Sequence, residues 1–128
     1  MLARIAHLSL LAAPLAFGAA CLPAPPTLAQ LTTQIFEPRC SASGCHGATD
    51  PARALNLQSD AIASLVDVAS VEDPAVPRGA PGDPDGSLLY LVLVGPVGAT
   101  RQMPPGAVLP AEDVELVRRW IEAGAAAD

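Results

Sequence analysis

The chain of 128 residues contains no lysine, and all seven of its positive charges are arginines. Thirteen acidic residues outnumber them, so the formal net charge is -6. The arginines are dispersed along the chain, apart from the pair Arg118 and Arg119. A nucleic-acid-binding surface needs clustered positive charge, and the sequence therefore argues against nucleic acid as a partner. The simplest interpretation is a solvated acidic surface, which also favours encounters with positively charged partners.

Aromatic residues are scarce, at 3% of the chain, and beyond residue 20 only Phe36, Tyr90 and Trp120 are aromatic. The length leaves room for one small domain and not for a second core. Such a chain has few large side chains with which to fill an interior. A large flat apolar cofactor would relieve this shortage, because burial of apolar surface stabilises a fold by about 25 cal/mol per Å². The composition thus permits a cofactor without requiring one.

Residues 1–20 have the three-part layout of a secretory signal peptide. Arg4 lies near the start, an apolar stretch covers residues 8–17, and small residues fill positions 18–20. The apolar stretch is shorter than a membrane span of about 20 residues, and Pro14 interrupts it. The sequence therefore predicts that residues 1–20 direct export and are then removed.

Cys21 follows the small residues directly and precedes a proline-rich stretch that ends at Pro26. This arrangement resembles a bacterial lipoprotein signal, although Gly18 stands where a larger apolar residue is usual. The resemblance implies a lipid on Cys21, with residues 21–26 as the tether, and a location on the periplasmic side of a bacterial membrane. The alternative is ordinary cleavage that leaves Cys21 unmodified. Either route takes the chain to a compartment in which disulfides form.

The pattern of the remaining residues, 27–128, predicts an all-α domain of short helices joined by long irregular connections. Thr27 and Gln30 are spaced as a capping box, and Pro38 is expected to end or kink the helix that they begin. Residues 72–85 are rich in proline, glycine and aspartate and are expected to form a surface loop. Residues 88–94 form an unbroken apolar run whose flanks favour a helix. The expected helices begin at Thr27, after a cap at Ser59, at Asp83 and at about Pro110, and the last one ends at Ala123.

The segment that carries chemistry runs from Cys40 to His46, with four residues between its two cysteines and a histidine directly after the second. Covalent haem attachment uses two cysteines for thioethers and an adjacent histidine as an iron ligand. The intervening residues are small, which lets the backbone approach a flat group. The alternatives are a short disulfide between Cys40 and Cys45 or a zinc site, which would want four ligands. The pattern favours one covalent haem c held by Cys40, Cys45 and His46.

A second iron ligand is suggested by elimination, because beyond residue 20 the chain contains one histidine, His46, and one methionine, Met103. A His/Met pair of axial ligands raises the reduction potential of a haem. Pro104 and Pro105 stiffen the segment after Met103. A lone methionine is more often a packing residue, but one followed by Pro-Pro-Gly is unusual in a core. The sequence therefore predicts Met103 as the second ligand.

These residues resemble the c-type cytochromes, specifically the small single-haem class. The resemblance rests on Cys40, Cys45 and His46, on residues 101–106 as the methionine loop, and on residues 115–125 as the closing helix. It implies a cytochrome c-like helical domain over residues 27–128, folded around one haem. It also implies that the last helix packs across the first, and this would pair Phe36 with Trp120 or Ile121.

The function that this resemblance implies is electron transfer with redox partner proteins that the sequence does not identify. No catalytic base, nucleophile or open metal position is evident, so an enzyme is not expected. An alternative from another class is an exported structural or interaction lipoprotein without haem, in which Cys40 and Cys45 form a disulfide. A haem enzyme or gas sensor is a third possibility, and it would require the Met103 side of the iron to be open.

Overall fold

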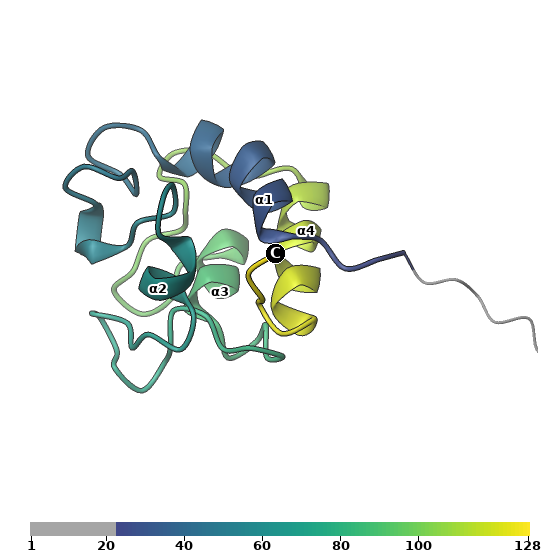
Figure 1. Ribbon diagram of the computed structural model, residues 1–128. Coiled ribbons are helices and arrows are strands. Elements are labelled where there is room, and N and C mark those ends of the chain that lie inside the picture. Colours follow the sequence, from purple (N-terminus) through teal and green to yellow (C-terminus); the bar gives the residue numbers. More distant parts are fainter. Residues whose placement is uncertain (1–22) are drawn as a thin grey trace, which may run out of the picture.

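The computed structural model describes residues 23–128. The predicted signal peptide and the predicted lipidation site, Cys21, lie outside these residues. Within them, no helix combines the length and the apolar character that crossing a membrane requires. The helical elements, in chain order, are α1 (Leu28–Leu31), the π-helical η1 (Thr32–Cys40), the 3₁₀-helical η2 (Ala52–Ala54), α2 (Ala61–Leu65), α3 (Leu88–Val94) and α4 (Ala111–Glu122) (Figure 1).

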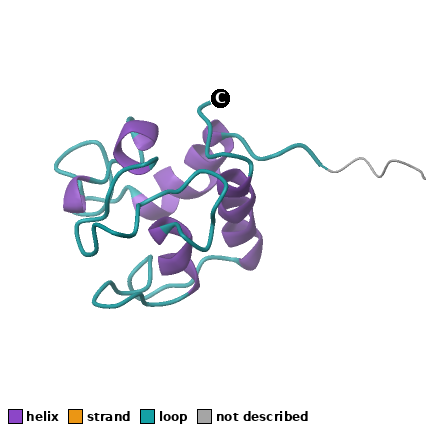
Figure 2. Ribbon diagram, turned by 90° about the horizontal axis from the view of Figure 1, so that it is seen from below, coloured by secondary structure: helices purple, strands orange, loops and turns teal. Residues whose placement is uncertain are grey.

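The prediction of an all-α, cytochrome c-like helical domain is wrong. Helical elements cover 38% of the described residues, and loops and turns make up most of the remainder (Figure 2). Four isolated β-bridges occur in the same part of the chain, among them Val66 with Gly79 and Ala69 with Pro77. Proline and glycine interrupt the connecting segments and prevent longer helices. Turns and bridges therefore satisfy much of the backbone there, because buried backbone groups need partners.

The first helical segment begins as predicted and continues past Pro38, the residue that was expected to end or kink it. The Thr27 hydroxyl accepts a hydrogen bond from the Gln30 amide at 3.1 Å, which is the expected N-cap contact. Pro38, however, neither ends the segment nor separates it from Cys40. The chain changes to the wider π-helical winding at Thr32 and continues past Pro38. As a result the first cysteine of the motif is the last residue of a helix.

Two of the other expected helices start elsewhere. The second begins at Ala61, and the Ser59 hydroxyl accepts a hydrogen bond from Asn56 instead of capping it. The third begins at Leu88, with Ser87 as its N-cap residue, and not at Asp83. Residues 83–86 form a turn before it, in which the Gly86 amide donates to the Asp83 side chain at 2.9 Å. Asp83, which was predicted to begin the helix, is thus part of a turn that precedes it.

The last helix matches its predicted span and carries much of the core. It runs from Ala111 to Glu122, with Pro110 and Ala123 as its cap residues, and Gly124 follows with a φ of 108°, which suits glycine. The helix contacts both α1 and α3. Phe36 and Trp120 are fully buried in the same apolar cluster, and the Trp120 indole N–H donates to the Ala126 carbonyl at 3.0 Å. The first and last helical segments therefore share one core.

The segment before α1 is attached to the last helix. The Arg119 guanidinium donates to the carbonyl oxygens of Pro23 and Ala24, at 3.1 and 2.8 Å. Pro26 is buried, and the Ala29 amide donates to the carboxylate of Asp128 at 2.8 Å. Arg119 of α4 thus holds the described part of the predicted tether against the domain, and Asp128 contacts the start of α1.

Candidate functional site

A compact loop holds Cys40, Cys45 and His46 together. The Cys45 amide donates to the Ala42 carbonyl at 2.9 Å, which closes a four-residue turn. Gly44 stands at the third position of this turn with a φ of 77°, as a type II turn requires. The His46 amide then donates to the Cys40 carbonyl at 2.8 Å. The turn therefore brings Cys40 and His46 together although five residues separate them in the sequence.

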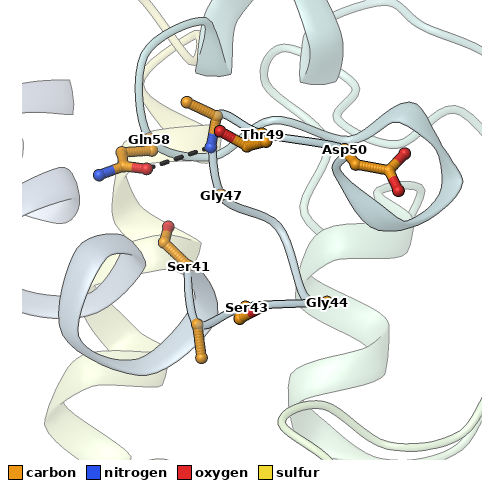
Figure 3. Close-up of a pocket in the computed structure, with 9 residues that line it drawn as sticks. Ser41, Ser43, Gly44, Gly47, Thr49, Asp50 and Gln58 are labelled. Atoms are coloured by element: carbon orange, nitrogen blue, oxygen red, sulfur yellow. Dashed lines mark hydrogen bonds between the residues drawn. The ribbon is translucent and has the colours of Figure 1, made fainter.

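The outer side of this loop is polar and open. A Cβ atom on the buried Gly47 would lie 2.8 Å from the Ser41 carbonyl oxygen. The backbone at residue 47 therefore approaches residue 41 too closely for any residue other than glycine. The Gln58 side chain accepts a hydrogen bond from the Ala48 amide at 3.1 Å (Figure 3). These segments enclose an open pocket of about 420 Å³. Its lining is polar or small, and it comprises Ser41, Ala42, Ser43, Gly44, Gly47, Ala48, Thr49, Asp50 and Gln58.

The thiols of Cys40 and Cys45 are both free and half-buried. Cys40 also packs against the main apolar cluster. Burial raises the pKa of the Cys40 thiol to about 11, to which the neighbouring Cys45 adds, while Arg39 opposes the rise. A thiol with a raised pKa stays protonated at neutral pH and is a weak nucleophile. Cys40 thus lacks the activation of a cysteine in a thiol-exchange enzyme.

The His46 imidazole is held by one ring nitrogen. Its Nδ1 lies 3.2 Å from the Leu55 carbonyl oxygen, and because a carbonyl only accepts, Nδ1 carries the hydrogen. Burial lowers the pKa of His46 from its ordinary value of 6.5; the backbone carbonyls of Leu55 and Ala52 oppose this change, and the charge of Arg78 adds to it. The neutral ring therefore presents the lone pair of Nε2, which is the form that binds a metal.

Met103 is anchored on both sides by its neighbours. Its amide donates to the Val92 carbonyl of α3 at 2.8 Å, and the Gln102 side chain donates to the Leu93 carbonyl at 3.2 Å. After it, the Ala107 amide bonds to the Pro104 carbonyl at 3.2 Å in a turn. The Met103 side chain is half-buried against the same apolar cluster as Cys40. Its role as second iron ligand stays a prediction.

Covalent haem c requires two thiols and an imidazole as donor groups. Two free thiols and a neutral imidazole lie together in this loop, so the donor set is compatible with such a group. The pockets at residues 41–58 and 102–108 contain none of Cys40, Cys45, His46 and Met103 in their linings. The compatibility with covalent haem therefore depends on the donor groups and the loop that holds them, and not on a pocket lined by these residues.

Sequence reasoning missed two groups at this site, the Leu55 carbonyl and Arg78. Arg78 lies in the segment predicted to be a surface loop, but the residue is only 7% exposed. Its guanidinium donates to the carbonyl oxygens of Arg53, Ala54 and Ser64. The flanking Pro77 and Gly79 are typical of loops, and no periodic pattern marks the residue as buried. Nothing in the sequence around Arg78 therefore signalled its position.

No protein-family model, curated protein or solved structure matches this chain. The chemistry of the loop that holds Cys40, Cys45 and His46 is therefore the main indication of its function. Among these, the orientation of His46 is the feature most specific to metal binding.

Proposed function

We propose that this protein carries single electrons through one haem c attached to Cys40 and Cys45, with His46 as an axial ligand. The observation that carries the proposal is the hydrogen bond from His46 Nδ1 to the Leu55 carbonyl at 3.2 Å. Such a bond fixes the tautomer and orientation of a metal-binding histidine. When bound, haem c supplies an iron that alternates between the ferric and ferrous states and so accepts and releases one electron.

The residues of the chain hold and shield this group. Cys40 and Cys45 provide the thioether sulfurs, and the loop bond from the His46 amide to the Cys40 carbonyl keeps all three residues together. Met103, anchored to α3 through Val92, is the candidate for the second axial ligand. Its thioether would favour the ferrous state and raise the reduction potential.

Apolar side chains at the margin of the core support the same proposal. Several are only partly buried and keep apolar surface that a flat cofactor would cover, which is favourable at about 25 cal/mol per Å². They come from separate segments between η1 and the loop after α3. The members of this group are Cys40, Leu55, Ile62, Val66, Tyr90 and Met103.

The proposed setting is the periplasmic side of a bacterial membrane, with Cys21 as the lipid-bearing residue. Arg119 holds the carbonyl groups of Pro23 and Ala24, so a chain lipidated at Cys21 would keep the domain close to the membrane. The net charge of -6 suits positively charged redox partners, because opposite charges steer encounters. The role is that of an electron carrier and not of an enzyme.

The test is a cysteine series made in a host that attaches haem c to exported proteins. Cys40→Ser and Cys45→Ser are each expected to leave at most one thioether and to lower the yield of haem-loaded protein, because each thioether needs its own sulfur. The double variant is expected to contain no covalent haem. The pyridine haemochrome spectrum and the mass of the denatured protein measure both outcomes.

Cys21→Ser is the matched control, because Cys21 is the one cysteine of the chain besides Cys40 and Cys45. It is expected to keep the wild-type haem content and to move the protein from the detergent fraction to the soluble exported fraction. Wild-type protein that lacks haem and contains a disulfide between Cys40 and Cys45 would instead favour the structural lipoprotein. An unmodified mature chain starting elsewhere would remove the lipid anchor and leave the haem proposal standing.

A further inference from the structure

Arg78 is the only buried charged side chain among residues 23–128. It takes part in none of the ion pairs in that range. Its guanidinium instead donates to three backbone carbonyls, those of Arg53, Ala54 at 3.1 Å and Ser64 at 2.7 Å. Burial of a charge is costly unless polar groups compensate it. The carbonyl dipoles that compensate Arg78 must therefore be held in place around it.

Two of these carbonyls belong to a strained turn. Arg53 and Ala54 have φ angles of 58° and 55°, in the left-handed region that residues with a Cβ atom rarely occupy. Two such residues in succession persist only where the surroundings hold them. Arg78 binds the carbonyl of each. The guanidinium is thus a group that stabilises this conformation directly.

The next residue along this turn is Leu55, whose carbonyl oxygen accepts the hydrogen bond from His46 Nδ1. A change in the backbone of residues 53–54 would move that carbonyl. Arg78 is itself fixed, because its amide donates to the Val68 carbonyl at 2.7 Å and its carbonyl accepts from the Leu89 amide at 2.9 Å. The start of α3 is therefore linked to the imidazole of His46 by hydrogen bonds at Arg78 and at Leu55, which the backbone of residues 53–55 connects.

We propose that Arg78 is the positioning residue of the histidine ligand: it clamps the carbonyls of the 53–54 turn and thereby aims the Leu55 carbonyl at His46 Nδ1. The planar guanidinium group of arginine suits this role, because one side chain must donate to three carbonyl oxygens in a fixed arrangement. The iron-ligand role of His46 comes from the proposed function, whereas the clamp on its ring does not depend on haem.

The test measures the ring N–H of His46 by nitrogen-edited NMR on the mature protein as isolated, in the reduced state where haem is present. Arg78→Gln is expected to accelerate the hydrogen exchange of this N–H by about tenfold or more, because hydrogen bonds to a charged donor hold the turn. The Trp120 indole N–H, which is bonded to Ala126, serves as the internal reference for global unfolding. Local positioning predicts faster exchange at His46 with little change at Trp120.

Arg118→Gln is the matched control, because it removes the same charge from surface ion pairs with Glu115 and Glu122 on α4, which contribute little to stability. It is expected to leave both exchange rates unchanged. Arg78→Lys keeps the charge without the fork, and it is expected to accelerate exchange at His46 while preserving the reduction potential of haem-loaded protein. Arg78→Gln is expected to lower that potential, because a nearby positive charge favours ferrous iron.

Wild-type exchange at His46 in either Arg78 variant would overturn the proposal, and so would equal acceleration at His46 and Trp120. If Arg78→Gln does not fold, Arg78→Lys carries the comparison alone. Protein that lacks haem would contradict the proposed function, but the exchange at the His46 ring would still decide whether Arg78 positions it.

Discussion

Removal of a single buried hydroxyl, in Ser87→Ala, is expected to lower the free energy of unfolding by about 2–4 kcal/mol. The Ser87 side chain is completely buried at the start of α3. Its hydroxyl donates to the Asp83 carbonyl at 2.7 Å and accepts from the Ala80 amide at 2.8 Å. Alanine would remove both hydrogen bonds and leave these two backbone groups without the partner that they have in the wild type.

The magnitude follows from these two contacts. A typical hydrogen bond contributes about 1 kcal/mol net, and a buried polar group left unpaired adds about 1–3 kcal/mol. A small domain has a total stability of about 5–15 kcal/mol, so the loss is a large share. At roughly 4–8 °C per kcal/mol for a domain of this size, the melting temperature should fall by at least about 8 °C.

The assay is urea unfolding of the mature protein, followed by the fluorescence of Trp120, which is the only tryptophan and is 2% exposed. Ser59→Ala is the matched control, because the Ser59 hydroxyl is exposed and only accepts from Asn56. It is expected to change the stability by no more than about 0.5 kcal/mol. Equal urea midpoints for the two serine variants would refute the reasoning from buried hydrogen bonds.

Three further outcomes are expected. Met103→Ala should erase the near-infrared band of sulfur-ligated ferric haem, lower the reduction potential and allow carbon monoxide to bind ferrous iron, as absorption spectra and electrochemistry would measure. The hydrogen bond from Arg118 lowers the pKa of Glu115 below its ordinary value of 4.5, so this carboxylate stabilises the fold above that pH. The stability advantage of wild type over Glu115→Gln should therefore disappear as the pH falls through the lowered pKa, in urea unfolding at several pH values. Arg119→Gln should release residues 23–26 and make them sensitive to proteases, since it removes their hydrogen bonds to α4.

Each of these outcomes has a control. Val108→Ala alters an exposed residue just after the methionine loop and should leave the haem spectrum unchanged. A wild-type spectrum in Met103→Ala would make Met103 a packing residue and favour an open haem site. In an Arg118→Gln background, Glu115→Gln should lose its pH effect, because the hydrogen bond that lowers the pKa of Glu115 is absent. Arg101→Gln should leave proteolysis unaffected, and equal cleavage in Arg119→Gln and wild type would show that the hydrogen bonds of Arg119 do not hold the segment.

The parts of the fold that the sequence predicted are those with local causes. Val117, Trp120 and Ile121 are buried in α4, and their spacing of three and four residues is that of one helical face. Thr27 caps α1 because the contact to Gln30 spans only three residues. Fold class was wrong because the pattern of short helices did not reveal how the proline- and glycine-rich connections pair through isolated bridges.

The site divides in the same way. The motif Cys40, Cys45 and His46 was visible as a sequence pattern, and a turn at Gly44 brings its members together. The Leu55 carbonyl that orients His46 was not visible, because every residue has a carbonyl and only the conformation of the intervening loop selects one. Arg78 is a similar case, since its three acceptors lie 14 to 25 residues away in the chain.

The central claim is covalent haem on Cys40 and Cys45, and the most direct measurement is the mass of the mature protein after denaturation. Wild type made in a host with haem-attachment machinery is expected to retain the added mass of one haem under denaturing conditions, because thioether bonds survive unfolding. A chain of unmodified mass, with both thiols free or joined in a disulfide, would contradict the account.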